Sequence, residues 1–441
     1  MRDIALALFV IGLVPFIVMR PWIGLLVWSW FGYMNPHRLT YGFAYGFPWV
    51  QVIAILTLVS LMVSKESKRI QWSSVGTLLL VFLLWTGFTT IFAVMPDAAW
   101  NKWSQFAKVL IMVFATMIVI NNRQRMHWLV WVIVISLGFY GVKGGLFTIL
   151  HGGIDHVLGP PNSFIAGNND LAQALCMTLP LIRYLQLQAS RRIIRIGLGV
   201  ALVLTGVGIL GSYSRGGFIA LAVVAVALIL KSRRRFVMLA VLLAVGYVGY
   251  NFMPPQWTAR MQTIEHARTV NTAQTRIQSW KFATNVALAR PLRGGGFDVY
   301  QSKVMWDLHG PEGAAQRAVH SIYFRVLGEQ GFIGLGLFLA LMFVGWRSCS
   351  KVRKRSRGSP ENKWAFDLAS MLQVSLLAFM VAGLATTSSY FDLSYQLLAM
   401  CALLLGFVRN VVPEPAGSGH DGSKPVLVRD GEPAMSASRH G

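Results

Sequence analysis

Arginine and histidine residues gather in one polar stretch, residues 254–319, and at its junction with the apolar run that follows. The stretch has few acids and holds Arg260, Arg268, Arg276, Arg290, Arg293 and Arg317. Guanidinium groups bind phosphate oxygens in pairs, so these arginines suit an anionic ligand such as a phosphate. His320 and Ser321 directly follow the stretch. A neutral imidazole accepts a proton near physiological pH, so His320 is either a general base or an interfacial residue that only forms hydrogen bonds.

A second cationic position lies at 212–217, a short turn between two apolar runs. An arginine at a membrane boundary is unfavourable unless it is paired, reaches water or lines a wet cavity. Arg215 is therefore a candidate functional residue, and the alternative is an arginine that extends to water from a helix end. Gly216 and Gly217 leave room for a ligand to approach the backbone.

Arg276 lies in a third segment, 275–280, which precedes the motif Pro-Leu-Arg-Gly-Gly-Gly at 291–296. Apolar residues recur at helical spacing from Ile277 to Val286 and predict a helix that lies on the membrane surface. Arg276 is then either a ligand-binding residue or one of several arginines on a solvated amphipathic helix. The glycine run lacks the Lys-Ser/Thr pair of a phosphate-binding loop, so we interpret it as a turn or a close backbone approach.

Apolar runs form the elements that must position these residues. The chain of 441 residues is 55% hydrophobic and 13% charged, with a mean hydropathy of +0.54. Its runs are long enough to cross roughly 30 Å of hydrocarbon, so we predict an all-α polytopic membrane protein with about 12 or 13 transmembrane helices. The candidate spans are 4–19, 21–34, 49–64, 75–95, 104–120, 128–149, 169–189, 194–212, 217–230, 236–253, 320–346, 364–386 and 392–409.

Basic clusters between these runs predict the topology. They fall at 65–69, 123–125, 191–195, 231–235 and 347–357. The order of the runs puts all five clusters on one side, which the positive-inside rule makes cytoplasmic. This topology accounts for most of the net charge of +23, so we predict no nucleic-acid partner. The segments predicted on the outer side of the membrane are 35–48, 96–103, 150–168, 213–216 and 254–319. The sequence does not decide on which side of the membrane the N-terminus lies.

These patterns divide the chain into four parts. Residues 1–253 form an N-terminal transmembrane bundle, 254–319 a long periplasmic loop with a surface helix, and 320–410 the C-terminal transmembrane helices. Residues 411–441 are rich in Pro, Gly and Ser, and we expect a disordered cytoplasmic tail. Acidic residues on the outer side are scattered, so we predict no metal site and no cofactor.

Three motifs, taken together and in this order, resemble the bacterial O-antigen ligases and the related Wzy-type polymerases. His320-Ser321, nine residues and then Gly331-Phe332-Ile333-Gly334 match the pattern His-[Asn/Ser/Gln]-x9-Gly-x-x-Gly of that superfamily. The Ser-x-Ser-Arg-Gly turn at 212–216 resembles a second motif of the superfamily. The segment Thr-Arg-x-x-x-Trp at 275–280, followed by Pro-Leu-x-Gly-x-Gly at 291–296, resembles a third. The resemblance covers about residues 160–405.

The segment 33–45 resembles a narrower subgroup, the O-glycosylation ligases associated with the exosortase A system. One position departs from the ligase pattern Arg-x3-Leu, because Ile219 stands where leucine is expected after Arg215. The sequence motifs therefore do not distinguish a ligase from a polymerase.

The resemblance implies a GT-C-like glycosyltransferase that moves a glycan from undecaprenyl diphosphate to an acceptor hydroxyl outside the inner membrane, with inversion and without metal. Arg215 and Arg276 would hold the diphosphate, and His320 would deprotonate the acceptor. The residues expected to contact the substrate are Ser214, Gly216, Arg293 and Ser321. The implied partners are the undecaprenyl diphosphate-linked glycan, an acceptor that is a lipid, a protein or a polysaccharide, and the membrane lipids.

Two alternatives remain from the sequence. A polymerase would use another lipid-linked glycan as its acceptor. A transporter of lipid-linked sugars would need charges deep within several spans, or broken helices at matching positions in two halves of the chain.

Overall fold

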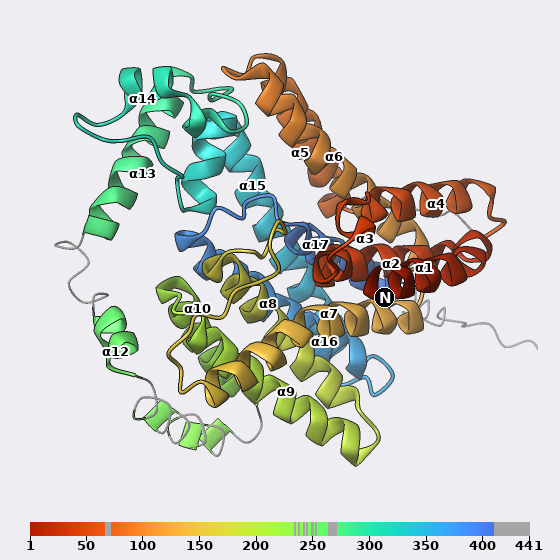
Figure 1. Ribbon diagram of the computed structural model, residues 1–441. Coiled ribbons are helices and arrows are strands. Elements are labelled where there is room, and N and C mark those ends of the chain that lie inside the picture. Colours follow the sequence, from red (N-terminus) through yellow and green to blue (C-terminus); the bar gives the residue numbers. More distant parts are fainter. Residues whose placement is uncertain are drawn as a thin grey trace, which may run out of the picture.

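The computed structural model describes residues 1–66, 72–232, 254–262 and 271–409, with a few single positions between 235 and 251. This part of the chain is built from helices and contains no β-strand (Figure 1). The longer helices are α1 (Arg2–Met19), α2 (Pro21–Met34), α4 (Trp49–Val63), α5 (Ser74–Ile91), α6 (Pro96–Val119), α7 (Arg123–Leu150), α8 (Asn168–Gln188), α9 (Arg192–Gly211), α10 (Arg215–Leu230), α13 (Asn271–Ala289), α15 (Ile322–Arg355), α16 (Lys363–Ala382) and α17 (Asp392–Arg409). The shorter ones are η1 (Pro36–Leu39), α3 (Phe43–Gly46), α12 (Pro255–Gln262), η2 (Val299–Gln301), α14 (Lys303–His309) and η3 (Gly383–Ala385).

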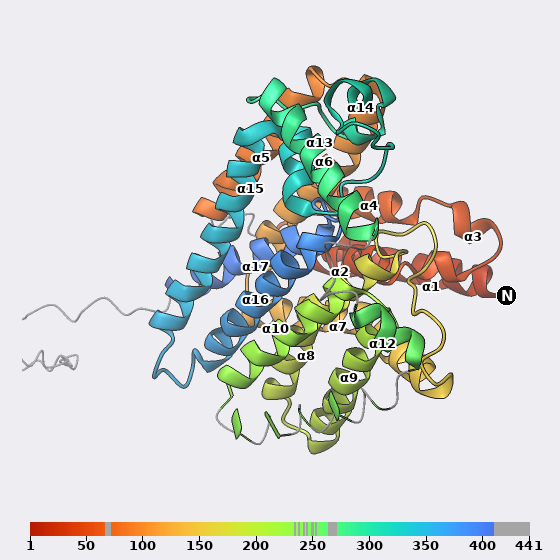
Figure 2. The same ribbon diagram turned by 90° about the vertical axis from the view of Figure 1, so that its left-hand side faces the viewer.

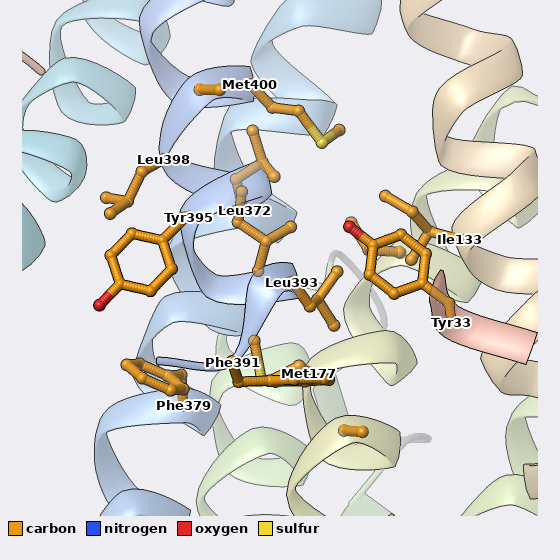
Figure 3. Packing of buried hydrophobic residues seen from close by; sticks show 14 of the residues in the cluster. Tyr33, Ile133, Met177, Leu372, Phe379, Phe391, Leu393, Tyr395, Leu398 and Met400 are labelled. Atoms are coloured by element: carbon orange, nitrogen blue, oxygen red, sulfur yellow. The ribbon is translucent and has the colours of Figure 1, made fainter. Parts of the chain in front are cut away.

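The centre of the bundle is formed by α8, α16 and α17. Every residue from Leu171 to Ile182 of α8 is buried, and so is every residue from Leu393 to Leu404 of α17. Tyr33 of α2 and Ile133 of α7 lie on the side of α17 toward which Leu393 points (Figure 3). The N-terminal helices therefore pack directly on the C-terminal core.

Seven helices in the described residues are long and apolar enough to cross a membrane: α1, α5, α6, α7, α9, α15, and α16 extended through η3. The apolar helices α4, α10 and α17 are shorter. Most residues of α1 and α9 are not buried in the protein, as expected for helices that face lipid. The prediction of an all-α polytopic membrane protein is confirmed.

The seven described helices that are long and apolar enough to span a membrane are fewer than the 12 or 13 transmembrane helices predicted from the sequence. α2 has only 14 residues, and most of the predicted span 236–253, like the tail 411–441, lies outside the described residues. α8 forms where the span 169–189 is predicted, but it carries polar side chains such as Gln173 and Arg183. These residues are tolerated because other helices, rather than lipid, surround most of α8.

Segments predicted to share the outer side meet at one end of the bundle. Asn162 in the loop between α7 and α8 donates a hydrogen bond to the Tyr45 hydroxyl at 2.9 Å. Tyr213 donates another to the backbone of the same loop at 2.6 Å. Two of the basic clusters also meet, because Arg125 lies 2.7 Å from Glu66, which stands within the first cluster. The helices α13 and α14 lie together beside one end of α15 (Figure 2).

The helix predicted from the apolar spacing after Ile277 forms as α13, but its apolar face packs on protein. Phe282 stacks on Trp306 of α14 with ring centroids 4.1 Å apart, and Trp280 stacks on Phe324 of α15 at 5.0 Å. α14 and α15 therefore cover much of this face, and the position of α13 on the membrane surface stays a prediction.

Candidate active site

His320 lies directly before the first turn of α15, and its backbone is in the left-handed region with φ at 47°. A non-glycine residue there costs of order 1–3 kcal/mol and needs support from its surroundings. Two side chains of α13 give that support. The Ser279 hydroxyl and the Trp280 indole N–H both donate to the Val319 carbonyl, at 3.3 and 3.1 Å. The position of His320 is therefore set jointly by α13 and α15.

Arg276 lies about one helical turn before Ser279 and Trp280, on the same face of α13. Burial, and after it the positive charge of Arg276, lowers the pKa of His320 below that of an ordinary histidine. A lowered pKa keeps the imidazole neutral, and so able to accept a proton, at neutral pH. The structure thus brings together two of the three residues predicted to be catalytic.

Arg215 opens α10, and the turn before it is held by the start of α8. Ser214 caps α10 by accepting a hydrogen bond from the Gly217 N–H at 3.1 Å, and its hydroxyl donates to Asn169 at 2.6 Å. Asn168 donates to the backbone carbonyl of the same turn at 2.9 Å. The backbone that carries Arg215 is therefore held at several points.

The 3-10 helix η3 joins the start of α10 to the start of α15. Gly216 packs so closely on Ala385 that an added Cβ would lie 2.6 Å from the alanine Cβ. At the other end of η3, an added Cβ on Gly383 would collide with Ile322 of α15. Arg215 and His320 therefore stand at the starts of two helices that both pack against this short turn.

The residues predicted to contact substrate lie in different surroundings. The Ser214 hydroxyl is engaged in the cap of α10 and in the bond to Asn169. Gly216 faces Ala385, so protein fills the open space predicted beside it. Ser321 is buried next to His320, and its hydroxyl has no hydrogen-bond partner within the described residues. Of these three, Ser321 lies closest in the chain to the candidate base.

Arg293, the fourth of these residues, lies in the loop that follows α13. Its guanidinium lies over the Phe92 ring, 4.8 Å from the centroid. The loop meets α15 at Gly331, where the backbone is not helical (φ 69°, ψ −171°). His320 precedes Gly331 by about three helical turns, roughly 15 Å along the axis. The structure therefore places the Arg293 loop apart from His320.

The break in α15 is closed by the loop 291–296. The N–H groups of Gly295 and Gly296 donate to two α15 carbonyls at 2.8 and 2.9 Å, and the Phe332 N–H donates to the Pro291 carbonyl at 2.9 Å. An unbroken helix would have paired these α15 groups internally. The Pro-Leu-x-Gly-x-Gly and Gly-x-x-Gly motifs therefore form one interlocked unit.

A buried charge network surrounds Arg325 and Glu329, which pair at i, i+4 spacing on α15. These two side chains are 3.1 Å apart, and Arg325 also lies 3.2 Å from Asp298 and donates to the Thr387 carbonyl at 2.7 Å. Tyr390 donates to Glu329 at 2.8 Å. Sequence reasoning missed Asp298 and Tyr390, because both come from segments far from α15 in the chain and no local spacing links them to it.

The arrangement as a whole presents cationic groups and one base at the same end of the bundle. The described residues contain no group of three or more His, Cys, Asp or Glu side chains placed to hold a metal ion. A guanidinium group such as that of Arg276 can hold an anionic group, and a nearby imidazole with a lowered pKa can take a proton from a hydroxyl.

This fold defines a multi-pass membrane protein that gathers arginine and histidine side chains at one end of its helix bundle. Residues 200–339 match the family described as O-antigen ligase. Arg215, Arg276 and His320 all lie within the matched segment. Residues 1–190 match a family of unknown function (DUF5935). No curated protein matches the chain.

Proposed function

We propose that this protein is an inner-membrane glycan ligase that transfers a glycan from undecaprenyl diphosphate to an acceptor hydroxyl on the periplasmic side. The observation that most supports the proposal is the proximity of Arg276 to His320, whose pKa is lowered by burial and then by this arginine, inside the segment that matches the O-antigen ligase family. The acceptor would be a lipid, a protein or a polysaccharide.

In the proposed reaction, His320 takes the proton of the acceptor hydroxyl while that oxygen attacks the anomeric carbon of the donor sugar. The bond from the anomeric carbon to the diphosphate oxygen breaks, and its electron pair leaves with the lipid diphosphate. Arg215 and Arg276 neutralise the growing negative charge, a role that a metal ion has in many other transferases. A single displacement of this kind inverts the anomeric centre.

The match to the family described as O-antigen ligase supports a ligase or a related polymerase, and we propose the ligase as the leading function. Ile219, the departure from the ligase pattern, is 44% exposed on α10, and the hydrogen bonds that hold the Arg215 turn do not involve it. The association with the exosortase A system rests on the 33–45 motif alone and stays a prediction.

An assay with purified protein tests the proposal directly. Undecaprenyl diphosphate-linked glycan is supplied with candidate acceptors, with and without a chelator. We expect a covalent glycan–acceptor product in both conditions. Protein that forms no product with any acceptor, yet moves the lipid-linked glycan across vesicles, would instead be a transporter.

A deletion strain separates the ligase from the polymerase. Loss of a ligase leaves long polymer that is not attached to its acceptor, whereas loss of a polymerase shortens the polymer. A gel of the surface and secreted polysaccharide distinguishes the two results.

Replacing Arg215 or Arg276 by lysine is expected to lower kcat about 100-fold or more. Lysine keeps the positive charge but loses the paired donors that fit a diphosphate. Turnover is measured with purified protein at saturating donor. Lys281→Gln, at an exposed position of α13, is the matched control and should keep the full rate. Normal turnover in both lysine variants would remove these arginines from the mechanism.

The acid limb of the pH–rate profile is expected below the usual histidine value of about 6.5, because burial and then Arg276 lower the pKa of His320. Below its pKa the imidazole is protonated and cannot act as a base. Arg276→Gln removes a positive charge, so it should raise the pKa and move the acid limb to higher pH. The profile of kcat/KM measures this shift. An unmoved limb in the variant would show that Arg276 does not act on the titrating group.

A further inference from the structure

A cavity of about 240 Å³ lies beside the candidate active site, and none of the three predicted catalytic residues lines it. Its polar lining consists of Lys102, Gln105, Ser163, Asp170, Arg325 and Ser388. Its aromatic lining consists of Phe106, Phe164, Phe297, Tyr390 and Phe391. Pockets for drug-sized molecules have volumes of roughly 300–1,000 Å³, so this cavity suits a ligand about the size of one ring.

The polar lining offers donors and acceptors together. Lys102 and Arg325 donate, Asp170 accepts, and the amide and hydroxyl groups do both. The charge of Arg325 is balanced by its two carboxylate partners, which do not line the cavity. Because Asp170 adds a negative charge to the lining itself, the cavity does not favour a bare anion such as phosphate.

The aromatic lining favours a ligand with an apolar surface as well as hydroxyls. Phe164 and Phe391 have ring centroids 6.4 Å apart, and those of Phe297 and Tyr390 are 4.8 Å apart. A sugar ring fits both halves of the lining, since its C–H faces pack on aromatic rings and its hydroxyls both donate and accept. An acyl chain would instead leave the charged side chains without partners.

Two residues that line the cavity are next in the chain to residues that hold the candidate active site. Asp170 directly follows Asn169, which binds the turn before Arg215. Ser388 donates to Asp170 and directly precedes Ser389, whose hydroxyl donates to the Ile322 carbonyl at 3.1 Å, just after His320. The cavity lining is therefore linked, through one neighbouring residue each, to the contacts that hold the backbone at Arg215 and just after His320.

Three parts of the chain build this cavity. Lys102, Gln105, Ser163 and Asp170 lie in the segment that matches the family of unknown function, Arg325 lies in the segment that matches the O-antigen ligase family, and Ser388 lies after it. We infer that the cavity binds a sugar ring of one of the two glycan substrates and that the N-terminal domain thereby selects that substrate. This inference rests on the proposed function, because it supposes that the protein handles glycans.

The test combines direct binding with kinetics, using the full-length protein in detergent. The binding probes are the oligosaccharide released by mild acid from the host's lipid carrier and the soluble glycan of the acceptor. We expect Asp170→Asn and Lys102→Gln each to weaken binding of one probe about 10-fold or more, the usual effect of losing a charge-assisted hydrogen bond. KM for the same substrate should rise to a similar extent, while kcat stays unchanged. Whether KM rises for the donor or for the acceptor identifies the source of the sugar.

Asp97→Asn and Lys108→Gln are the matched controls. Asp97, like Asp170, lies in the first turn of its helix, and Lys108 is exposed on α6, as Lys102 is; neither lines the cavity. Equal binding of both probes by the wild-type protein and the two cavity variants, or no binding of either probe, would overturn the inference while leaving glycan transfer intact. If the wild-type protein bound a probe through Asp170 but transferred no glycan, the sugar site would stand and the proposed ligase activity would fall.

Discussion

His320→Asn is expected to lower the rate of glycan transfer by about 10²–10⁴-fold while leaving the protein folded and inserted. Asparagine tolerates the left-handed backbone conformation that His320 adopts at φ 47°, so the variant tests the loss of the base rather than backbone strain. It has no group that can accept a proton at neutral pH. The rate is measured with purified protein, undecaprenyl diphosphate-linked glycan and acceptor.

Two further variants separate the loss of the imidazole from backbone strain and from the general effect of replacing a histidine. His320→Ala adds a strained backbone to the loss of the imidazole and should therefore be less stable than His320→Asn. His309→Asn changes a histidine in the same polar stretch, at the end of α14, and should keep the full rate. Full activity in correctly inserted His320→Asn protein would exclude His320 as the base.

Gly331→Ala is expected to lower the free energy of unfolding by about 3 kcal/mol or more, because two unfavourable effects combine. The conformation at φ 69° and ψ −171° is open almost only to glycine. An added Cβ would also lie 2.5 Å from the Leu292 carbonyl oxygen and 2.7 Å from that of Pro291. These are backbone atoms, and Phe332 binds the Pro291 carbonyl, so the loop cannot move away without losing that hydrogen bond.

Thermal unfolding in detergent and the yield of folded protein measure this effect. Gly336→Ala is the control on the same helix, because an added Cβ there meets no atom within 4 Å. Replacing a helical glycine by alanine without strain should be neutral or stabilise the protein by about 0.5–1 kcal/mol. If both variants unfolded at the wild-type midpoint, the break in α15 would not depend on the conformational freedom of Gly331.

Much of the candidate site could be read from motifs, but not the positions of all its residues. The resemblance pointed to Arg276 and His320, and the structure places them close enough for the arginine charge to act on the imidazole. The same kind of reasoning placed Arg293 with the substrate, whereas the structure places its loop at the break in α15. Sequence order shows which residues a motif contains, but it does not show which of them share one pocket.

The sequence by itself determined most of the helices and predicted which loops share a side of the membrane. Apolar runs and basic clusters are local properties, so they predicted most helices from α1 to α17 and the shared end of the outer segments. Only the tertiary structure decided that α8 is surrounded by protein, that α13 packs on α15, and that the cavity exists. The wall of this cavity includes a hydrogen bond from Ser388 to Asp170, two residues that lie 218 positions apart in the chain. No local pattern encodes such a contact, because it depends on how whole helices pack.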